Sequence, residues 1–185
     1  ETEVNALKKV TIEIKKPITC IIGGSKISSK IDIIKNLIPK FNNIIFVGGM
    51  ANNILRFKGN RIGKSISEKN CESIIKEIFE ISKNTLCEIT YPEDVLTGKS
   101  SDGDAQIKDL KDITDDDLIL DLGPKTLKKI SNIIENSKTI LWNGPAGYFE
   151  NPNFAKGSFE IAKTIIKKNK DNSIYSVVGG GDTVA

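Results

Sequence analysis

Six short segments of the chain are rich in β-branched and other apolar residues, and most of them show no alternation with polar residues. Such near-continuous apolar runs are typical of strands that are covered on both faces, as in a parallel sheet. The pattern therefore predicts six buried strands, which are Ile18–Ile22, Asn43–Val47, Cys87–Thr90, Leu118–Asp121, Thr139–Trp142 and Ser173–Val178.

Stretches with helical spacing lie between these segments. In the clearest one, the apolar residues from Cys71 to Ile78 fall on one helix face, and Ser65 with Glu68 forms a plausible capping box at its start. Strands that alternate with helices predict an α/β fold, namely a Rossmann-like three-layer sandwich with a six-stranded, mainly parallel sheet. Residues 1–11 look like the end of a helix that leads in from elsewhere.

Glycine follows five of the six predicted strands. Ligands of open α/β sheets bind outside the carboxyl ends of the strands, where glycine lets a ligand approach the backbone and helix N-termini present N–H groups to anions. One glycine pair could be only a tight turn, but five together predict a ligand-binding rim. The loops concerned are Gly23-Gly24, Gly48-Gly49, Leu122-Gly123-Pro124, Asn143-Gly144-Pro145 and Gly179-Gly180-Gly181.

The composition of the 185 residues narrows the function classes. The chain is 38% hydrophobic, which suits one domain with a sizeable core. Lys and Arg number 27 against 24 Asp and Glu, and this interspersed net charge of +3 is too mild for a nucleic-acid partner. No apolar run approaches the roughly 20 residues of a membrane helix. The acidic stretch from Asp102 to Asp117 lacks the order of a calcium loop and is predicted to be a solvated surface segment.

Two absences exclude further chemistry. The sequence has no histidine, which removes imidazole-based zinc sites and nucleophile pairs built on histidine. Cys20, Cys71 and Cys87 lack metal-ligand spacing, and their odd number favours reduced thiols in a cytoplasmic protein.

Two common phosphate-binding motifs are also absent. The segment Gly59–Ser65 is one residue too short for a Walker A loop, and the segment Glu93–Ser100 lacks that loop's first glycine. No Gly-x-Gly-x-x-Gly follows the first strand, which disfavours an NAD-dependent dehydrogenase.

The predicted rim nevertheless carries charges that suit a nucleotide. Lys26 and Lys30 follow the first strand at a spacing that places both on one face if a helix begins there. After the fifth strand, Asn143 can donate to an oxygen and Glu150 can accept from ribose hydroxyls. We expect Asp182 to stand at the start of a helix after the sixth strand, where it can be an N-cap, a ligand of hydrated Mg²⁺ on the phosphates, or both.

These segments, in this order, resemble the C-terminal, nucleotide-binding domain of phosphoglycerate kinase. The resemblance covers nearly the whole chain, and it rests on the ordered set rather than on any single motif. Its segments are Gly-Gly-x-Lys at 23–26 with Lys30, Gly-Gly-Met-Ala at 48–51, Ile62–Ser65, Asp121–Lys125, Trp142–Glu150 and Gly-Gly-Gly-Asp-Thr at 179–183.

The resemblance implies phosphoryl transfer between 1,3-bisphosphoglycerate and ADP, giving 3-phosphoglycerate and ATP, with Mg²⁺ on the nucleotide. It implies that Lys30 stabilises the transferring phosphoryl group, that Lys26 helps hold the phosphates and that Asp182 engages Mg²⁺. It places Glu150 at the ribose. It further implies phosphate contacts from Asn143, Gly180, Gly181 and Thr183, and an adenine site framed by Gly23, Gly24, Gly48, Gly49 and Pro145.

The chain also departs from the family pattern. Ser29 stands where the family usually has an acidic residue, which puts any role of that carboxylate in doubt. Residues 1–11 would end an interdomain helix, residues 12–185 would form a nucleotide-binding domain truncated at its C-terminal end, and the N-terminal domain that grips phosphoglycerate would be absent. We therefore expect a monomeric protein that binds nucleotide without turnover. The alternative is a noncatalytic, ATP-responsive binding module.

Overall fold

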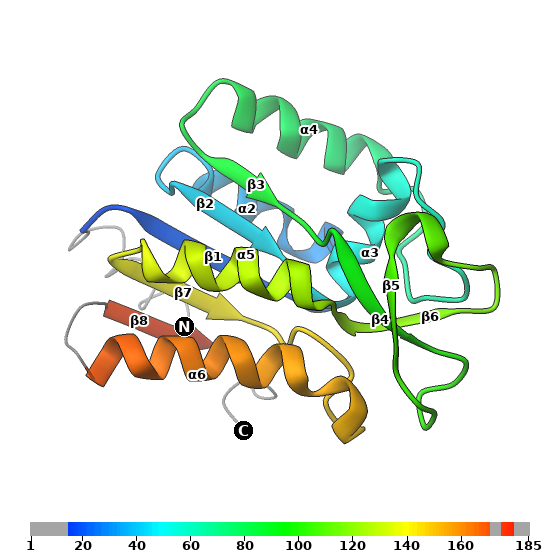
Figure 1. Cartoon of the computed structure of the whole chain (residues 1–185). Coiled ribbons are helices and arrows are strands. Elements are labelled where there is room, and N and C mark those ends of the chain that lie inside the picture. The colour runs from blue at the N-terminus through cyan, green and yellow to red at the C-terminus, as the bar shows by residue number, and fades with distance from the viewer. Residues whose placement is uncertain (1–14, 171–174, 180–185) are drawn as a thin grey trace.

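A parallel five-stranded sheet forms the centre of the molecule (Figure 1). The computed structural model describes residues 15–170 and 175–179. All neighbouring strands of this sheet run in the same direction. In spatial order they are β3 (Glu88–Thr90), β2 (Asn43–Phe46), β1 (Ile18–Ile22), β7 (Thr139–Asn143) and β8 (Tyr175–Gly179). The predicted interdomain helix at residues 1–11 lies outside the described residues.

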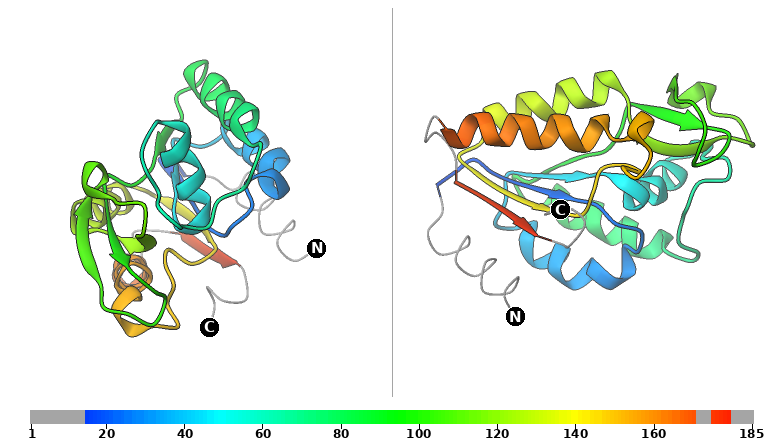
Figure 2. Two further views of the ribbon diagram at one scale, coloured as in Figure 1. Left: turned by 90° about the vertical axis from the view of Figure 1, so that its right-hand side faces the viewer. Right: turned by 90° about the horizontal axis from the view of Figure 1, so that it is seen from below.

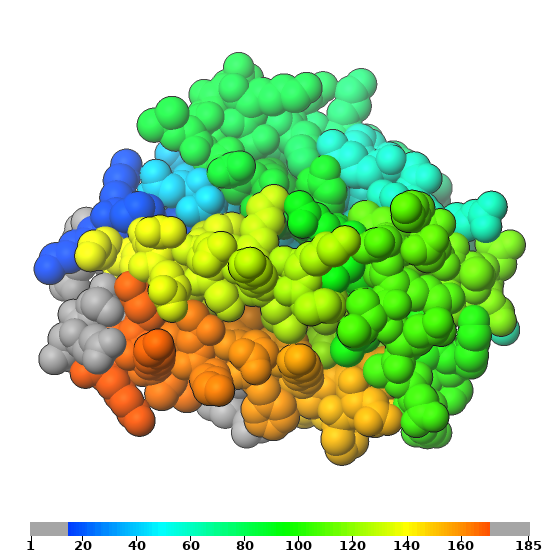
Figure 3. All heavy atoms as spheres, viewed as in Figure 1, coloured from blue at the N-terminus to red at the C-terminus, as the bar shows by residue number. Residues whose placement is uncertain are grey.

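Helices cover both faces of this sheet, so the predicted three-layer sandwich is confirmed (Figure 2). On one face lie α2 (Ile31–Leu37), α3 (Gly48–Phe57) and α4 (Glu72–Lys83). On the other lie α5 (Pro124–Glu135) and α6 (Lys156–Lys170), which form the face seen in Figure 3. Short 3-10 helices occur at Ser28–Lys30, Leu110–Asp112 and Pro152–Phe154.

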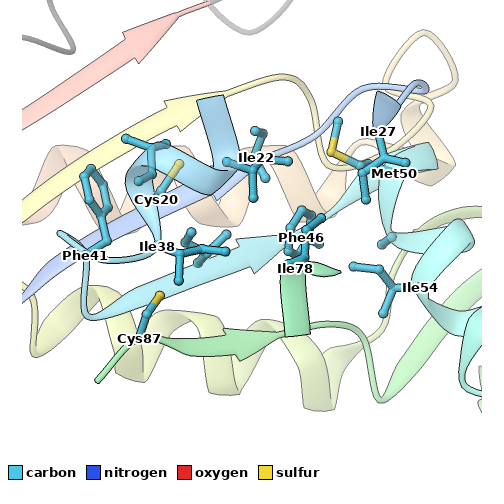
Figure 4. Close-up of a cluster of buried hydrophobic side chains, with 14 of the residues drawn as sticks. Cys20, Ile22, Ile27, Ile38, Phe41, Phe46, Met50, Ile54, Ile78 and Cys87 are labelled. Carbon is cyan, nitrogen blue, oxygen red and sulfur yellow. The ribbon is translucent and has the colours of Figure 1, made fainter. Parts of the chain in front are cut away.

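The alternation of side chains along the buried strands builds two separate cores. In β1, Cys20 and Ile22 point towards α2, α3 and α4, where they meet Ile38, Phe46 and other apolar side chains (Figure 4). Ile21 points the other way, into the core under α5 and α6. Because every residue of β1 is buried, the near-continuous apolar run in the sequence is explained by cover on both faces.

A small antiparallel sheet lies beyond the carboxyl ends of the parallel strands (Figure 1). Its order is β5 (Gln106–Asp109), β4 (Asp94–Gly98) and β6 (Leu118–Leu122). The predicted strand Leu118–Asp121 lies in this sheet, so within the described residues the parallel sheet has five strands and the six-strand prediction is wrong. The apolar run of β6 arises because the strand pairs with β4 and contacts α3 and α6.

The start of α4 also differs from the prediction. The helix begins at Glu72, with Ile75 and Ile78 buried as the periodicity requires. Ser65 and Glu68 do not form a capping box, because both side chains have partners elsewhere. Ser65 Oγ accepts a hydrogen bond from Ile119 N at 2.7 Å, and Glu68 Oε1 accepts one from Ser28 N at 3.1 Å.

The acidic stretch that ends at Asp117 is only partly solvated. Asp117 is buried and accepts hydrogen bonds from Lys99 Nζ and Lys108 Nζ, both at 2.7 Å, and from Thr114 N at 2.8 Å. Burial opposes ionisation, but these hydrogen bonds outweigh it and hold the pKa of Asp117 well below its usual range. The prediction of a wholly solvated segment is therefore wrong at this residue.

Candidate functional site

The loops after β1, β2 and β7 meet at one edge of the parallel sheet. Gly23 N donates to Asn143 O at 2.7 Å, and a Cβ at Gly23 would lie 2.5 Å from Pro145 O. Gly48 has a φ of +62°, and a Cβ there would lie 2.8 Å from Pro145 O. These two glycines are therefore required for the close approach of the loops, in addition to any contact with a ligand.

A pocket of about 420 Å³ opens between these loops and the small antiparallel sheet. One wall comes from the loops and from α3, and the facing wall comes from β6 with parts of β4 and the 92–101 segment. Apolar side chains predominate among its lining residues, which are Gly24, Ser25, Gly48, Gly49, Ala51, Asn52, Ser65, Ile66, Pro92, Val95, Ser101, Leu118 to Leu122, Pro145, Ala146, Gly147 and Tyr148.

Lys30 and Asn143 are brought together from distant parts of the sequence. Asn143 ends β7, in register with Ile22 of β1, and Lys30 ends the 3-10 helix that follows β1. Lys30 Nζ donates to Asn143 Oδ1 at 2.7 Å. The ammonium group is thereby held beside the carboxyl ends of the central strands, where it can attract an anion.

The N-terminus of α3 faces the same pocket. Gly48 and Gly49 are the first two residues of this helix and line the pocket, and no side chain caps the helix at Val47. Met50 N, in the first turn, donates to Gly24 O at 2.6 Å. The positive end of the helix dipole, at Gly48 and Gly49, favours negative charge at this edge.

The N-termini of α5 and α6 are closed by buried carboxylates instead. Asp94 accepts hydrogen bonds from Lys125 N at 3.0 Å and Thr126 N at 2.9 Å, at the start of α5. A Cβ at Gly123 would lie 2.3 Å from this carboxyl group. The glycine after the fourth predicted strand therefore makes room for Asp94, and only Leu122 of the predicted loop Leu122-Gly123-Pro124 lines the pocket.

Asp121 closes the N-terminus of α6 in the same way that Asp94 closes that of α5. Its Oδ2 accepts from Gly157 N at 2.9 Å and its Oδ1 from Leu122 N at 2.8 Å, while the residue also lines the pocket. Burial raises the pKa of Asp121 to about 6, against the lowering effects of these two hydrogen bonds and of Lys156. A carboxyl group with a pKa near neutrality thus lies in the pocket wall.

Of the predicted site residues, Gly24, Gly48, Gly49 and Pro145 line the pocket, and Gly23 lies behind them. Lys30 and Asn143, which contact each other, are half-buried, whereas Lys26 and Glu150 are exposed; none of these four is among the lining residues. The other predicted residues, Gly180, Gly181, Asp182 and Thr183, lie outside the described residues.

The facing wall was missed by sequence reasoning. Ser65, Ile66, Pro92, Val95 and the 118–122 segment carry no phosphate motif, and their proximity depends on the antiparallel pairing of β4 with β6. The sequence offered two signals for this wall: the apolar run at Leu118–Asp121, which predicted a strand but not its antiparallel sheet, and the segments Ile62–Ser65 and Asp121–Lys125 of the family resemblance.

Two other chemistries lack support in the described part of the chain. Residues 15–170 and 175–179 contain no group of three or more Cys, Asp or Glu side chains that could hold a metal ion. Cys20, Cys71 and Cys87 are buried free thiols, and burial raises the pKa of Cys20 to about 12.

None of the described helices has the length and apolar character needed to span a membrane.

Comparisons with known proteins agree with this geometry. The family model "Phosphoglycerate kinase" matches residues 1–185. The phosphoglycerate kinase of Wolbachia pipientis wMel is 40% identical over 186 residues, which cover 100% of this chain and 47% of that protein. The phosphoglycerate kinase of Zymomonas mobilis subsp. mobilis is 37% identical over 187 residues, with the same two coverages of 100% and 47%.

Solved structures give the same result. The phosphoglycerate kinase of Coxiella burnetii superposes with a TM-score of 0.91 at 34% identity, covering 99% of this chain and 47% of that one. The enzyme of Pyrococcus horikoshii OT3, at 24% identity and a TM-score of 0.76 over 99% of this chain and 46% of that one, shows the shared fold alone. The chain spans about half the length of these relatives. By the match of its whole length and by these relatives, the chain belongs to the phosphoglycerate kinase family.

Proposed function

We propose that this chain is the nucleotide-binding half of a two-domain phosphoglycerate kinase. The reaction is reversible transfer of a phosphoryl group from 1,3-bisphosphoglycerate to Mg-ADP, giving 3-phosphoglycerate and ATP, as in glycolysis and gluconeogenesis. The observation that carries the proposal is the apolar pocket lined by the loops after β1, β2 and β7, together with the Lys30–Asn143 pair at the carboxyl ends of β1 and β7.

The pocket suits the base of the nucleotide. A flat aromatic ring gains stability from burial between apolar walls, and the glycines of the three loops allow it to approach the backbone. We assign adenine to the space framed by Gly24, Gly48, Gly49 and Pro145, with Gly23 supporting the frame.

The phosphates are assigned to the positive groups at the edge of the pocket. The ammonium group of Lys30 attracts them, and the exposed Lys26 side chain adds a further charge. By the family resemblance, Glu150 binds the ribose. Gly180, Gly181 and Thr183 accompany Asn143 along the phosphates.

The chemical step needs little from the protein besides position and charge. A β-phosphate oxygen of ADP attacks phosphorus, the acyl phosphate P–O bond breaks, and 3-phosphoglycerate leaves as a carboxylate. No proton has to be removed from the attacking oxygen, so a site without histidine is adequate. Lys30, oriented by Asn143, stabilises the negative charge of the transferring group.

Magnesium fits this proposal through the nucleotide rather than through a cluster of protein ligands. When bound, Mg²⁺ neutralises phosphate charge, and it is usually held by one or two carboxylates together with the phosphates. Asp182 is our candidate for that carboxylate.

The whole reaction is proposed to need a second domain. Closure of two domains would bring the acyl phosphate to ADP and exclude water, which otherwise accepts the phosphoryl group. We therefore expect this chain alone to hold nucleotide without turnover. We also expect a monomeric, cytoplasmic protein.

Replacing Lys30 tests the proposal in the complete two-domain enzyme. We expect Lys30→Ala to lower kcat by about 10²–10³, the usual loss on removal of one preorganised electrostatic group, with a modest change in nucleotide affinity. Steady-state kinetics and calorimetric titration with Mg-ADP measure the two effects. Lys40→Ala, an exposed lysine beyond the end of α2, is the matched control and should leave both unchanged.

A noncatalytic module that only responds to ATP predicts a different result. Nucleotide would then bind to the wild-type protein, but no transfer to 3-phosphoglycerate would occur, with or without Lys30. That outcome would contradict the proposed reaction.

A further inference from the structure

The short helix that carries Lys30 is held in place by a residue distant in the sequence. Lys30 is the last residue of the 3-10 helix Ser28–Lys30. At the start of that helix, Ser28 N donates to Glu68 Oε1 at 3.1 Å. Glu68 lies in the connection between α3 and α4, so it links two loops that are 40 residues apart in the sequence.

The backbone around Glu68 is itself fixed to α3. Asn53 Oδ1 accepts from Glu68 N at 2.6 Å, and Asn52 Nδ2 donates to Ile66 O at 3.0 Å. Arg56 donates from Nη1 to Ser67 Oγ at 2.8 Å and from Nη2 to Glu68 O at 2.5 Å. Segment 66–68 is therefore attached by three side chains of one regular helix and can serve as a rigid support.

The carboxyl group of Glu68 is ionised at neutral pH. Hydrogen bonding by Ser28 holds the pKa of Glu68 below its usual value, against the opposing effect of burial, and Lys26 adds electrostatic attraction. An ionised acceptor makes a stronger hydrogen bond to a backbone N–H than a neutral one does.

We propose that Glu68 is a positioning residue, which holds the Ser28–Lys30 helix so that the Lys30 ammonium group meets Asn143 and the transferring phosphoryl group. This inference rests on the role proposed above for Lys30. Ile66, two residues from Glu68, lines the pocket assigned to adenine. The 66–68 segment therefore connects the base site with the lysine.

The charge of Glu68 by itself would have the opposite effect on the reaction. A carboxylate near Lys26 lowers the positive potential that the phosphates experience, so its removal should favour transfer. A loss of rate on replacing Glu68 therefore indicates a geometric role rather than a field effect.

Three replacements of Glu68 in the complete two-domain enzyme separate these possibilities. Glu68→Ala removes the hydrogen bond, Glu68→Asp keeps the charge but shortens the reach, and Glu68→Gln keeps an acceptor oxygen at full length. We expect kcat to fall about tenfold or more in the Ala and Asp variants, as for a loss of accurate positioning, and about threefold or less in the Gln variant. The KM for ADP should stay within about threefold of the wild-type value.

A double-mutant cycle shows whether Glu68 acts through Lys30. If it does, kcat of the variant with both Lys30→Ala and Glu68→Ala should be no lower than that of Lys30→Ala alone. Glu72→Ala is the matched control, since Glu72 is an exposed acidic residue at the start of α4. It should leave kcat unchanged.

Several results would overturn the inference. They are an unchanged or raised kcat in Glu68→Ala, full additivity with Lys30→Ala, or parallel losses of kcat, ADP affinity and thermal unfolding temperature in both the Ala and Gln variants. Each of these leaves the proposed function standing if the wild-type enzyme transfers phosphoryl groups. Absence of transfer in the wild-type enzyme would overturn the proposed function, and this inference with it.

Discussion

Asp121 shows how one buried carboxyl group can serve both the fold and the pocket. It accepts hydrogen bonds from backbone N–H groups at the start of α6 and after β6, and it lies in the pocket wall. Gly147 and Gly157 leave the space that it fills, since a Cβ at either would lie under 3 Å from Asp121 Oδ1. The residue thus joins α6, β6 and the 144–148 loop.

Its pKa predicts a pH-dependent contribution to stability. The folded-state pKa of about 6 lies above the ordinary value of 3.8, so folding favours the protonated form. The associated stabilisation is fully present below the unfolded-state pKa and is lost as the pH rises through about 6. At neutral pH the folded protein must therefore keep a buried charge.

Asp121→Asn removes this titration. The quantity of interest is the free energy of unfolding of the wild type minus that of the variant. It should decrease by about 2–3 kcal/mol between pH 4 and pH 7.5, whichever protein is the more stable at pH 4. Urea denaturation at several pH values measures the difference, and Asp115→Asn, at an exposed site, is the control. A difference that does not change with pH would contradict the burial argument.

At the residue scale, the sequence predicted the positions of the central glycines, whereas the contact between Lys30 Nζ and Asn143 Oδ1 was found only in the structure. Gly24, Gly48 and Gly49 follow directly from strands whose positions are predictable, and they line the pocket. Lys26 is exposed and lies outside the 3-10 helix Ser28–Lys30, so the predicted α-helical turn that would place Lys26 and Lys30 on one face does not form. Spacing alone could not distinguish these two backbones.

At the element scale, the helices and strands that could be predicted are those with a clear pattern of apolar residues in their own sequence. The strands of the parallel sheet carry near-continuous apolar runs and α4 carries an apolar helical periodicity, and the structure confirms these elements. β4 and β5 were not predicted. The pattern also could not tell which sheet β6 joins, because a strand that lines a pocket and contacts helices can have the same apolar run as one inside a parallel sheet.

The small antiparallel sheet depends on Asp117, which none of the sequence patterns indicated as important. Its carboxylate binds Lys99 and Lys108, and its carbonyl oxygen accepts from Lys64 N at 2.8 Å. The residue therefore ties the sheet to the 63–65 loop, next to the pocket residues Ser65 and Ile66.

Asp117→Ala should destabilise the protein by about 3–5 kcal/mol, because Lys108 is left nearly buried without its partner. Guanidinium or urea unfolding measures the loss. Asp115→Ala, an exposed aspartate of the same segment, is the control and should change the free energy of unfolding by less than about 0.5 kcal/mol. If Asp117→Ala lowered the free energy of unfolding no more than Asp115→Ala does, the hydrogen bonds of Asp117 would not be stabilising the antiparallel sheet.

At the scale of the whole molecule, the two sheets have different tasks. The parallel sheet, with a core on each face, fixes the directions in which β1, β2 and β7 deliver their loops. The antiparallel sheet supplies the opposite wall of the pocket. The family resemblance rests mainly on loops that follow the strands of the parallel sheet, whereas the shape of the facing wall depends on the pairing of β4 with β6.

The central claim is that an adenine nucleotide binds between these two sheets. Titration of this chain with Mg-ADP, followed by amide chemical shifts in NMR, tests it most directly because the readout locates the ligand. We predict saturable shifts at Gly24, Gly48 and Gly49 on one wall and at residues 118–122 on the other. Absence of shifts up to millimolar Mg-ADP, or saturable shifts confined to residues away from these walls, would contradict the account.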